Sequence, residues 1–175
     1  MNYIVVNGYP KSGKDTFVEY CQQALGRRYS TNLSTVDFVK QMAKLSGWDG
    51  SKTPENRKFL SDLKKLLTEW NDVPYKFLIN TANNWKVESY CDFSIDESEL
   101  WVFIHCREPE EIDKFVQRNG AKTVLIRRAA VEGDNQSNDS DANVLDYKYD
   151  YVIENNGTLD ELKKKAYKFI EEIQK

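Results

Sequence analysis

Two glycines and a lysine near the start of the chain have the spacing of a loop that binds phosphate groups. The run Gly8-Tyr9-Pro10-Lys11-Ser12-Gly13-Lys14 places four residues between its glycines and follows an apolar segment, residues 3–6. Glycine tolerates the backbone angles that turn successive N–H groups toward phosphate oxygens, and the positive end of a following helix adds to the attraction. We therefore expect the loop to bind the phosphates of a nucleoside triphosphate, with the Lys14 amine at the outer phosphates.

Oxygen ligands for a metal ion follow directly after Lys14. Asp15 stands where such loops usually carry the Ser or Thr that holds magnesium, and Thr16 comes next. Carboxylate and hydroxyl oxygens are ligands that Mg²⁺ prefers. Either residue is a candidate ligand, directly or through water, and the sequence leaves this choice open. The residues expected to contact the phosphates or the metal are Gly8, Lys11, Ser12, Gly13, Lys14, Asp15 and Thr16.

The overall composition is typical of one globular domain. The chain has 175 residues, of which 40% are hydrophobic and 30% charged, and its net charge is −3. This length suits a single domain, residues 1–175, with a substantial core. A small negative charge gives no general attraction to nucleic acid or to an anionic membrane, and no apolar run is long enough to cross a bilayer. We expect a soluble, cytoplasmic protein that binds small-molecule nucleotides but neither nucleic acid nor membrane, in an oligomeric state that the sequence leaves open.

Thiol and imidazole chemistry has little support in this sequence. Cys21, Cys91 and Cys106 are odd in number and widely spaced, which argues against a disulfide framework or a cysteine-rich zinc site, so we expect buried thiols. His105 is the only histidine, and it lies in the apolar run 100–106, where a core or strand-end position is expected. A catalytic triad or a multi-histidine metal centre is therefore poorly supported.

The segments that must position the loop alternate between strand-like and helix-like patterns. Short apolar or β-branched runs predict strands, and apolar residues at helical spacing lie between them. The expected strands are residues 3–6, 29–34, 100–106, 122–126 and 151–154. Because alternating strands and helices require crossover connections, we expect an α/β fold of three layers, with a mainly parallel five-stranded sheet between helices.

The longest interval between expected strands is helical in pattern and forms an expected insertion, about residues 35–90. Ser34 or Thr35 is expected to cap its first helix, and Thr53 its second, with Pro54 at the first helical position. The second helix carries an apolar stripe that we interpret as core, with an interface as the alternative: Phe59, Leu60, Leu63, Leu66, Leu67 and Trp70. The polar residues 129–146 are expected to form a lid-like loop.

Several segments resemble those of a known kinase family. The loop, which ends Ser-Gly-Lys-Asp-Thr, is similar to the variant loop of phage and bacterial deoxynucleoside monophosphate kinases, and animal phosphomevalonate kinase has a similar Ser-Gly-Lys-Asp. Residues 37–40 lie where those kinases place an Asp-containing segment, and residues 107–112 resemble their Arg-containing strand exit. Residues 151–162 are similar to the end of many nucleoside monophosphate kinases, where that turn lies beside the adenine. The resemblance covers most of the chain and implies a fold of the P-loop nucleoside triphosphate hydrolase type, with a helical flap and a short lid.

This resemblance implies transfer of a phosphoryl group from ATP, with Mg²⁺, to a small phosphorylated acceptor, expected to be a nucleoside or deoxynucleoside monophosphate. The acceptor phosphate is already an anionic nucleophile, so catalysis consists of positioning and charge neutralisation. The implied catalytic residues are Lys14, Arg107, Arg127 and Arg128. Asp37, Arg57 and Arg107 are implied on the acceptor side, and Asn156 and Gly157 beside the adenine.

One departure from the family keeps other functions open. His105 stands where those kinases commonly have an acidic residue, two positions before Arg107. A catalytically degenerate ATP-binding protein is one alternative, and a nucleotide-dependent switch or ATPase that reports to a protein partner is another. A phosphorylated acceptor that is not a nucleotide also remains open. A GTPase is disfavoured because the sequence has no Asn-Lys-x-Asp guanine signature.

Overall fold

A parallel five-stranded sheet forms the middle layer of the computed structural model, which describes residues 1–26, 29–89, 96–132 and 144–175. The strand order is β2-β3-β1-β4-β5, and all the pairings are parallel. The strands are β1 (Asn2–Asn7), β2 (Ser30–Ser34), β3 (Trp101–His105), β4 (Lys122–Arg127) and β5 (Tyr151–Glu154). Each expected strand is present. The carboxyl ends of all five strands therefore meet at one edge of the sheet.

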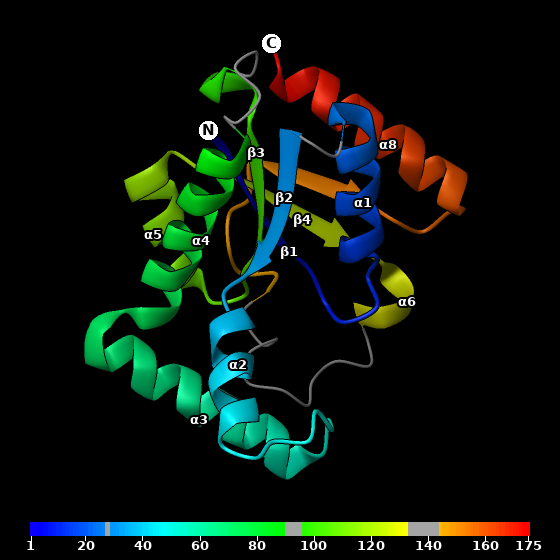
Figure 1. Cartoon of the computed structure of the whole chain (residues 1–175). Coiled ribbons are helices and arrows are strands. Elements are labelled where there is room, and N and C mark those ends of the chain that lie inside the picture. The colour runs from blue at the N-terminus through cyan, green and yellow to red at the C-terminus, as the bar shows by residue number, and fades with distance from the viewer. Residues whose placement is uncertain (27–28, 90–95, 133–143) are drawn as a thin grey trace.

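Helices cover both faces of this sheet, which confirms the predicted three-layer α/β class (Figure 1). The covering helices are α1 (Lys14–Leu25), α4 (Val73–Ser89), α5 (Pro109–Asn119) and α8 (Leu159–Ile173). Alternate side chains of a strand point to opposite faces. In β1, Ile4 and Val6 belong to the core against α1 and α8, whereas Tyr3 and Val5 belong to the core against α4 and α5. The strand that leads into the loop is thus buried on both sides.

Two further helices, α2 (Asp37–Leu45) and α3 (Pro54–Asn71), extend beyond the carboxyl edge of the sheet (Figure 1). The expected cap of α3 is confirmed, because the Thr53 side chain accepts a hydrogen bond from the Asn56 N–H. The expected cap of α2 is wrong, since neither Ser34 nor Thr35 is its N-cap residue. Instead, the carboxylate of Asp37 accepts a hydrogen bond from the Ser34 N–H at 2.8 Å, which closes the turn between β2 and α2.

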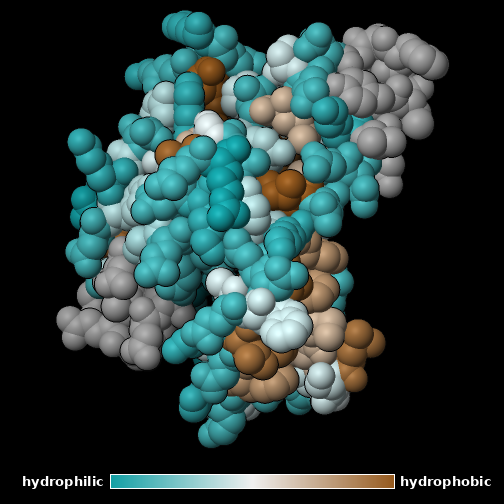
Figure 2. All heavy atoms as spheres, turned by 90° about the vertical axis from the view of Figure 1, so that its left-hand side faces the viewer, coloured by the Kyte–Doolittle hydropathy of each residue, from teal (hydrophilic) through white to brown (hydrophobic). Residues whose placement is uncertain are grey.

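The apolar stripe of α3 is not part of the core, so our interpretation of it was wrong. None of the α3 residues is buried, and Leu66 and Trp70 are 63% and 79% exposed. The helix that packs on the sheet is α4, through Leu78 and Ala82. Helical periodicity identifies an apolar face but does not say what covers it. Figure 2 shows apolar side chains gathered at the surface over the lower part of the molecule, where α2 and α3 lie.

Ion pairs join the α3–α4 segment to α5. The Nζ atom of Lys64 on α3 lies 2.7 Å from Oε2 of Glu111 on α5, and both side chains are largely buried. Asp72, between α3 and α4, has a left-handed backbone and binds Lys114 at 2.8 Å and Arg118 at 3.3 Å. The turn between α3 and α4 is therefore fixed to the body of the molecule.

Some expectations fall outside the described residues. These include Cys91 and residues 133–143 of the expected lid-like loop, 129–146. Before that gap the chain forms the short helix α6 (Ala129–Glu132), and a short 3₁₀ helix, η2 (Glu97–Glu99), precedes β3. Cys21 and Cys106 are free and buried, as expected. Within the described ranges, none of the helices has the length and hydropathy of a membrane-spanning segment.

Candidate active site

The loop between β1 and α1 passes through three backbone positions with positive φ. The φ angles are 146° at Gly8, 63° at Lys11 and 96° at Gly13, a region that residues with a side chain rarely adopt. A Cβ atom on Gly8 would collide with the carbonyl oxygen of Ile126 in β4. Gly13 is the N-cap residue of α1. The structure therefore has a tightly curved loop that ends at a helix N-terminus, and two of its turns require glycine.

Two amide side chains hold this loop in place. Asn7 accepts a hydrogen bond from the Gly8 N–H at 2.7 Å and donates one to the Tyr149 hydroxyl at 2.7 Å. Asn155, after β5, donates a buried hydrogen bond of 2.8 Å to the carbonyl oxygen of Ser12. We did not predict either residue, because an asparagine at a strand end has no periodic signal that marks it as a loop support.

Hydrogen-bond donors gather in and over the loop. The Lys14 amine donates to the carbonyl oxygens of Gly8 and Tyr9 at 2.7 and 2.8 Å, so it lies across the loop rather than in solvent. The Ser12 hydroxyl is buried and has no hydrogen-bond partner among the residues that the structure describes. Buried polar groups almost always have a partner, so an orphaned donor here fits an anionic ligand. Backbone N–H groups, a hydroxyl, an ammonium and the positive end of α1 together suit phosphate oxygens.

Asp15 and His105 meet beside the start of α1. The Asp15 carboxylate is 94% exposed, and its Oδ1 atom lies 3.6 Å from Nε2 of His105, at the end of β3. This distance is too long for a hydrogen bond. The pKa of His105 lies below its usual value because burial disfavours the charged ring; Lys14 and Arg107 lower it further, whereas Asp15 and Asp37 raise it. Burial therefore favours the neutral form of the His105 ring.

The core or strand-end position expected for His105 is confirmed, because this residue ends β3. Its Nε2 atom is buried and has no hydrogen-bond partner within the described part of the chain. Thr16, the other candidate metal ligand, is half-buried in the first turn of α1. Arg107 follows β3, and its carbonyl oxygen accepts a hydrogen bond from the Asn7 side chain at 3.3 Å. The loop therefore lies together with the candidate metal ligands and Arg107 at the carboxyl edge of β1 and β3.

Asp37 lines a pocket of about 380 Å³ between β2, α2 and α4. Lys40, Gln41 and Lys44 line the same pocket and follow Asp37 by three, four and seven positions, which places all four on one face of α2. That spacing was a signal in the sequence that we did not use. The full lining is Leu33, Ser34, Asp37, Lys40, Gln41, Lys44, Phe77, Leu78 and Thr81.

Arg127 is engaged by carboxylates at the end of β4. Its guanidinium donates to both carboxylate oxygens of Glu132 at 2.9 Å, and it lies 3.5 Å from Glu154. A two-point pairing of this kind fixes the direction of the guanidinium, here toward α6. Arg128 is exposed at the exit of the same strand. The structure places both arginines at the carboxyl edge of the sheet, on the β4 side of the loop.

The turn expected beside the adenine lies next to α6. The side-chain oxygen Oδ1 of Asn156 accepts a hydrogen bond from the Ala129 N–H at 2.8 Å, and its side-chain nitrogen Nδ2 donates to the Glu154 carboxylate at 3.3 Å. At Gly157 a Cβ atom would collide with the carboxylate of Glu161, the residue that completes the capping box of α8. The structure thus puts the two residues in one compact turn, at the same edge of the sheet as the loop.

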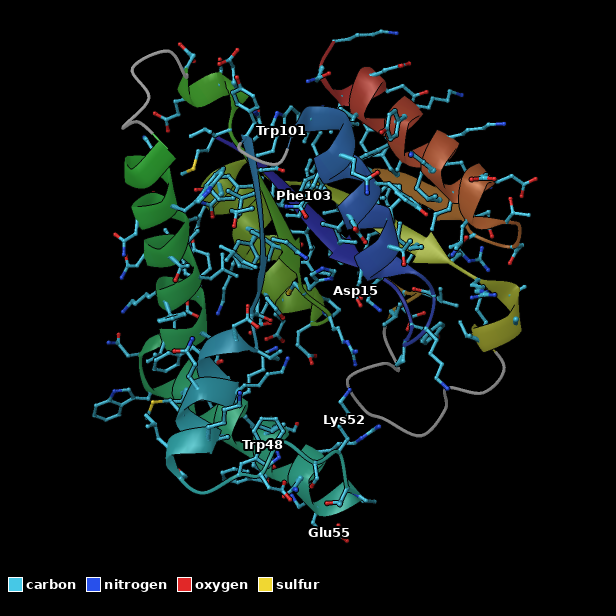
Figure 3. The ribbon with its side chains drawn as sticks, turned by 45° about the vertical axis from the view of Figure 1, so that its right-hand side comes forward. Asp15, Trp48, Lys52, Glu55, Trp101 and Phe103 are labelled. Carbon is cyan, nitrogen blue, oxygen red and sulfur yellow. The ribbon has the colours of Figure 1, made fainter. Side chains whose placement is uncertain are left out.

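Arg57 lies on the exposed face of the first turn of α3, and its Nε–H donates to the carbonyl oxygen of Lys52 at 3.1 Å. From the connection between α2 and α3, the Lys52 side chain extends toward the side on which Asp15 lies, whereas Glu55 points away (Figure 3). Trp48, in the same connection, is held by a hydrogen bond from its indole N–H to the Ser51 carbonyl at 3.0 Å. Lys52 was not among our expected site residues.

Comparisons with known proteins identify no family for this chain. No protein-family model matches it, and no curated protein matches it. Among solved structures, a provisionally named kinase from Chloroflexus aurantiacus aligns with 95% of this chain and 97% of its own chain, at 12% sequence identity and a TM-score of 0.49. That identity is too low for residue roles to be transferred from that protein to this one.

Proposed function

We propose that this protein transfers a phosphoryl group from ATP to a small phosphorylated acceptor, with a nucleoside or deoxynucleoside monophosphate as the favoured acceptor. The observation that carries the proposal is the loop from Gly8 to Lys14. It combines glycines that no other residue can replace without collision or strain, an orphaned buried hydroxyl at Ser12, and an amine lying across the loop. These features serve an anion better than they serve the fold alone.

On the donor side, the loop N–H groups and the start of α1 neutralise the charge of the triphosphate, and Lys14 adds a full positive charge. Asp15 and Thr16 offer the oxygen atoms that fit a magnesium ion. When bound, that ion neutralises charge that develops on the phosphate oxygens. Lys11 is exposed in the loop and is available to add charge at the outer phosphate.

On the acceptor side, we assign the pocket lined by Asp37. Asp37 both lines the pocket and acts electrostatically on His105, so the pocket lies close to the loop. Lys40 and Lys44 suit an anionic group, and Phe77, whose ring packs against Phe38 with centroids 4.8 Å apart, suits a flat ring. An acceptor with an aromatic base and a phosphate meets both requirements.

Arg107 is the arginine that we assign to the acceptor phosphate, because it leaves β3 at the edge where ligands of parallel sheets collect. Arg127 is held by Glu132, so a role for it in the transfer requires that this pair opens. An arginine directed at the transferring group is worth on the order of a thousandfold in rate. No general base is needed, since the acceptor phosphate is already anionic.

The test is an assay of ADP formation from ATP and Mg²⁺ with each of the common ribo- and deoxynucleoside monophosphates. We expect at least one of them to stimulate ADP release strongly. Lys14→Met should abolish the stimulated rate, whereas Lys122→Met, at the opposite edge of the sheet, should retain it. If none of the acceptors raises ADP release above that with ATP alone, the proposal is wrong.

A second candidate, a nucleotide-dependent switch, is favoured by the apolar side chains exposed on α2 and α3. Leu45 is 82% exposed and Trp70 79% exposed, and exposed apolar clusters often mark contact sites for other proteins. This function predicts slow ATP hydrolysis that needs no acceptor. It also predicts partner binding that differs between the ATP and ADP states.

A further inference from the structure

We infer that His105 supplies a nitrogen ligand, next to the carboxylate of Asp15, to the divalent cation that accompanies the nucleotide. The cation site then contains imidazole nitrogen and should favour Mn²⁺ or Co²⁺ over Mg²⁺ more than an all-oxygen site does. The inference rests on the proposed function, because the nucleotide brings the cation into the site.

The distance between the two side chains suits ligands of one ion. Two donors that each lie about 2.1 Å from one ion are about 3.0 Å apart at a right angle and about 3.4 Å apart at the tetrahedral angle. Nε2 of His105 and Oδ1 of Asp15 are 3.6 Å apart, which is beyond hydrogen-bond contact and close to this range. The Asp15 side chain is 94% exposed, so a small rotation brings its oxygen to the required distance.

The imidazole nitrogen lacks any other role in the described structure. Nε2 is buried and has no hydrogen-bond partner in residues 1–26, 29–89, 96–132 and 144–175, which is costly for a polar atom unless a ligand satisfies it. Imidazole is the commonest metal ligand in proteins, and Nε2 is one of its two ligating atoms.

The charges around His105 explain why the cation should arrive with phosphate. Two cationic side chains, Lys14 and Arg107, and two carboxylates, Asp15 and Asp37, act on the ring. The positive end of α1 adds to the cationic side. Because these positive and negative charges largely cancel, they attract a metal ion alone only weakly. The negative charge of a bound triphosphate adds the attraction that favours cation binding. We therefore expect weak binding of Mn²⁺ alone and tighter binding of the Mn²⁺–nucleotide complex.

The type of ligand sets the metal preference. Mg²⁺ is a hard ion that selects oxygen, whereas imidazole suits transition metals. Mn²⁺ accepts both kinds of donor, and affinity for a nitrogen-containing site rises further toward Co²⁺. Asp15 and Thr16 supply oxygen atoms, which both Mg²⁺ and Mn²⁺ accept. The imidazole of His105 is the ligand that makes the site prefer Mn²⁺ over Mg²⁺.

A direct test uses pulsed electron paramagnetic resonance on the Mn²⁺ complex of a hydrolysis-resistant ATP analogue bound to tag-free protein. We expect a coupling from a directly bound ¹⁴N nucleus. Because His105 is the only histidine in the chain, growth with ¹⁵N-histidine labels this one ring, and the coupling should change to that of ¹⁵N. A bound complex whose spectrum does not respond to the label would overturn the inference and leave the proposed function standing.

A second measurement compares affinities by calorimetry. The preference of the protein for the Mn²⁺ complex of the analogue over its Mg²⁺ complex should fall about tenfold in His105→Asn. Thermal unfolding of the variant checks that it is folded, and Asn83→Ala, on the exposed side of α4, serves as control. An unchanged preference in folded His105→Asn contradicts the inference. Failure of wild-type protein to bind the analogue with any metal contradicts the proposed function, and the inference with it.

Discussion

The side-chain amide of Asn155 donates a 2.8 Å hydrogen bond to the backbone carbonyl oxygen of Ser12, and thereby ties the turn after β5 to the loop after β1. Both residues are buried. Asn155→Ala leaves that carbonyl without its partner, at a cost of about 1–3 kcal/mol in the free energy of unfolding. We also expect several-fold weaker ATP binding, measured by calorimetry, because the loop loses a support. Asn83→Ala should change neither quantity, and a variant of Asn155 with full ATP affinity would show that the loop holds its shape alone.

Gly13 has a second reason to be glycine besides its φ of 96°, because a Cβ atom there would collide with the amide of Asn155. Gly50 is a matched control, since its φ is 89° but a Cβ atom there would meet nothing within 4 Å. Gly50→Ala should lower stability by about 1 kcal/mol through backbone strain alone, and Gly13→Ala by about 1–3 kcal/mol more. Urea unfolding of both variants measures the difference. Equal losses would mean that the Asn155 side chain moves aside.

The ion pair between Lys64 and Glu111 is largely enclosed, with side-chain exposures of 15% and 11%. Lys64→Met leaves a carboxylate with little water and no cation, so we expect a loss of about 2–4 kcal/mol in stability, somewhat under that of a fully buried pair. The double variant Lys64→Met/Glu111→Leu should recover most of it. Lys58→Met, which removes an exposed pair on the same helix, should have no measurable effect. A double variant as unstable as the single one would show that the pair is not the cause.

The exposed face of α3 predicts tolerance to polar substitution. Leu66→Gln and Trp70→Gln should each change the free energy of unfolding by less than about 0.5 kcal/mol, since neither side chain is buried. Leu78→Ala, on the sheet side of α4, should cost about 2–5 kcal/mol. Denaturant unfolding distinguishes them. A large loss at Trp70 would reveal that another surface covers it in solution.

Burial raises the pKa of the Cys21 thiol. It also raises the pKa of the Cys106 thiol well above its usual value, and the nearby Glu111 carboxylate adds to that rise. A raised pKa means less thiolate at a given pH, and the thiolate is the reactive form. Both cysteines should therefore resist a thiol reagent at mildly alkaline pH until the protein is unfolded. Mass mapping of labelled peptides tests each site. Rapid labelling of Cys106 in the native protein would contradict the packing around α5.

Local signals in the sequence were enough for the sheet and the loop. Each strand is a short apolar or β-branched run, and Gly8, Gly13 and Lys14 sit at fixed spacing between the first strand and a helix. Capping residues were more variable. Thr53 caps its helix as its sequence pattern predicts, whereas Asp37 closes its own turn from inside the helix. Which of several nearby polar side chains caps a helix depends on backbone angles, and a sequence pattern does not give these angles.

What escaped prediction depends on contacts between distant residues. The hydrogen bond between Asn155 and Ser12 spans 143 positions, and no pattern links the two. At least one of Arg127 and Arg128 is expected to face the site, but no sequence pattern indicates that Glu132, five residues after Arg127, binds the Arg127 guanidinium. The stripe of α3 looked like core because it is apolar, yet α4 occupies the place on the sheet.

The amine of Lys14 is already anchored by the carbonyl oxygens of Gly8 and Tyr9. A long side chain thus loses much of its conformational freedom during folding. When a phosphate binds, the amine exchanges carbonyl oxygens for phosphate oxygens, and binding does not have to order the side chain first. The same ammonium group stabilises the curved backbone of the loop and serves as the counterion of a substrate. Replacing this lysine should therefore weaken the native state and the grip on the nucleotide together, and a loss of activity in such a variant combines both effects.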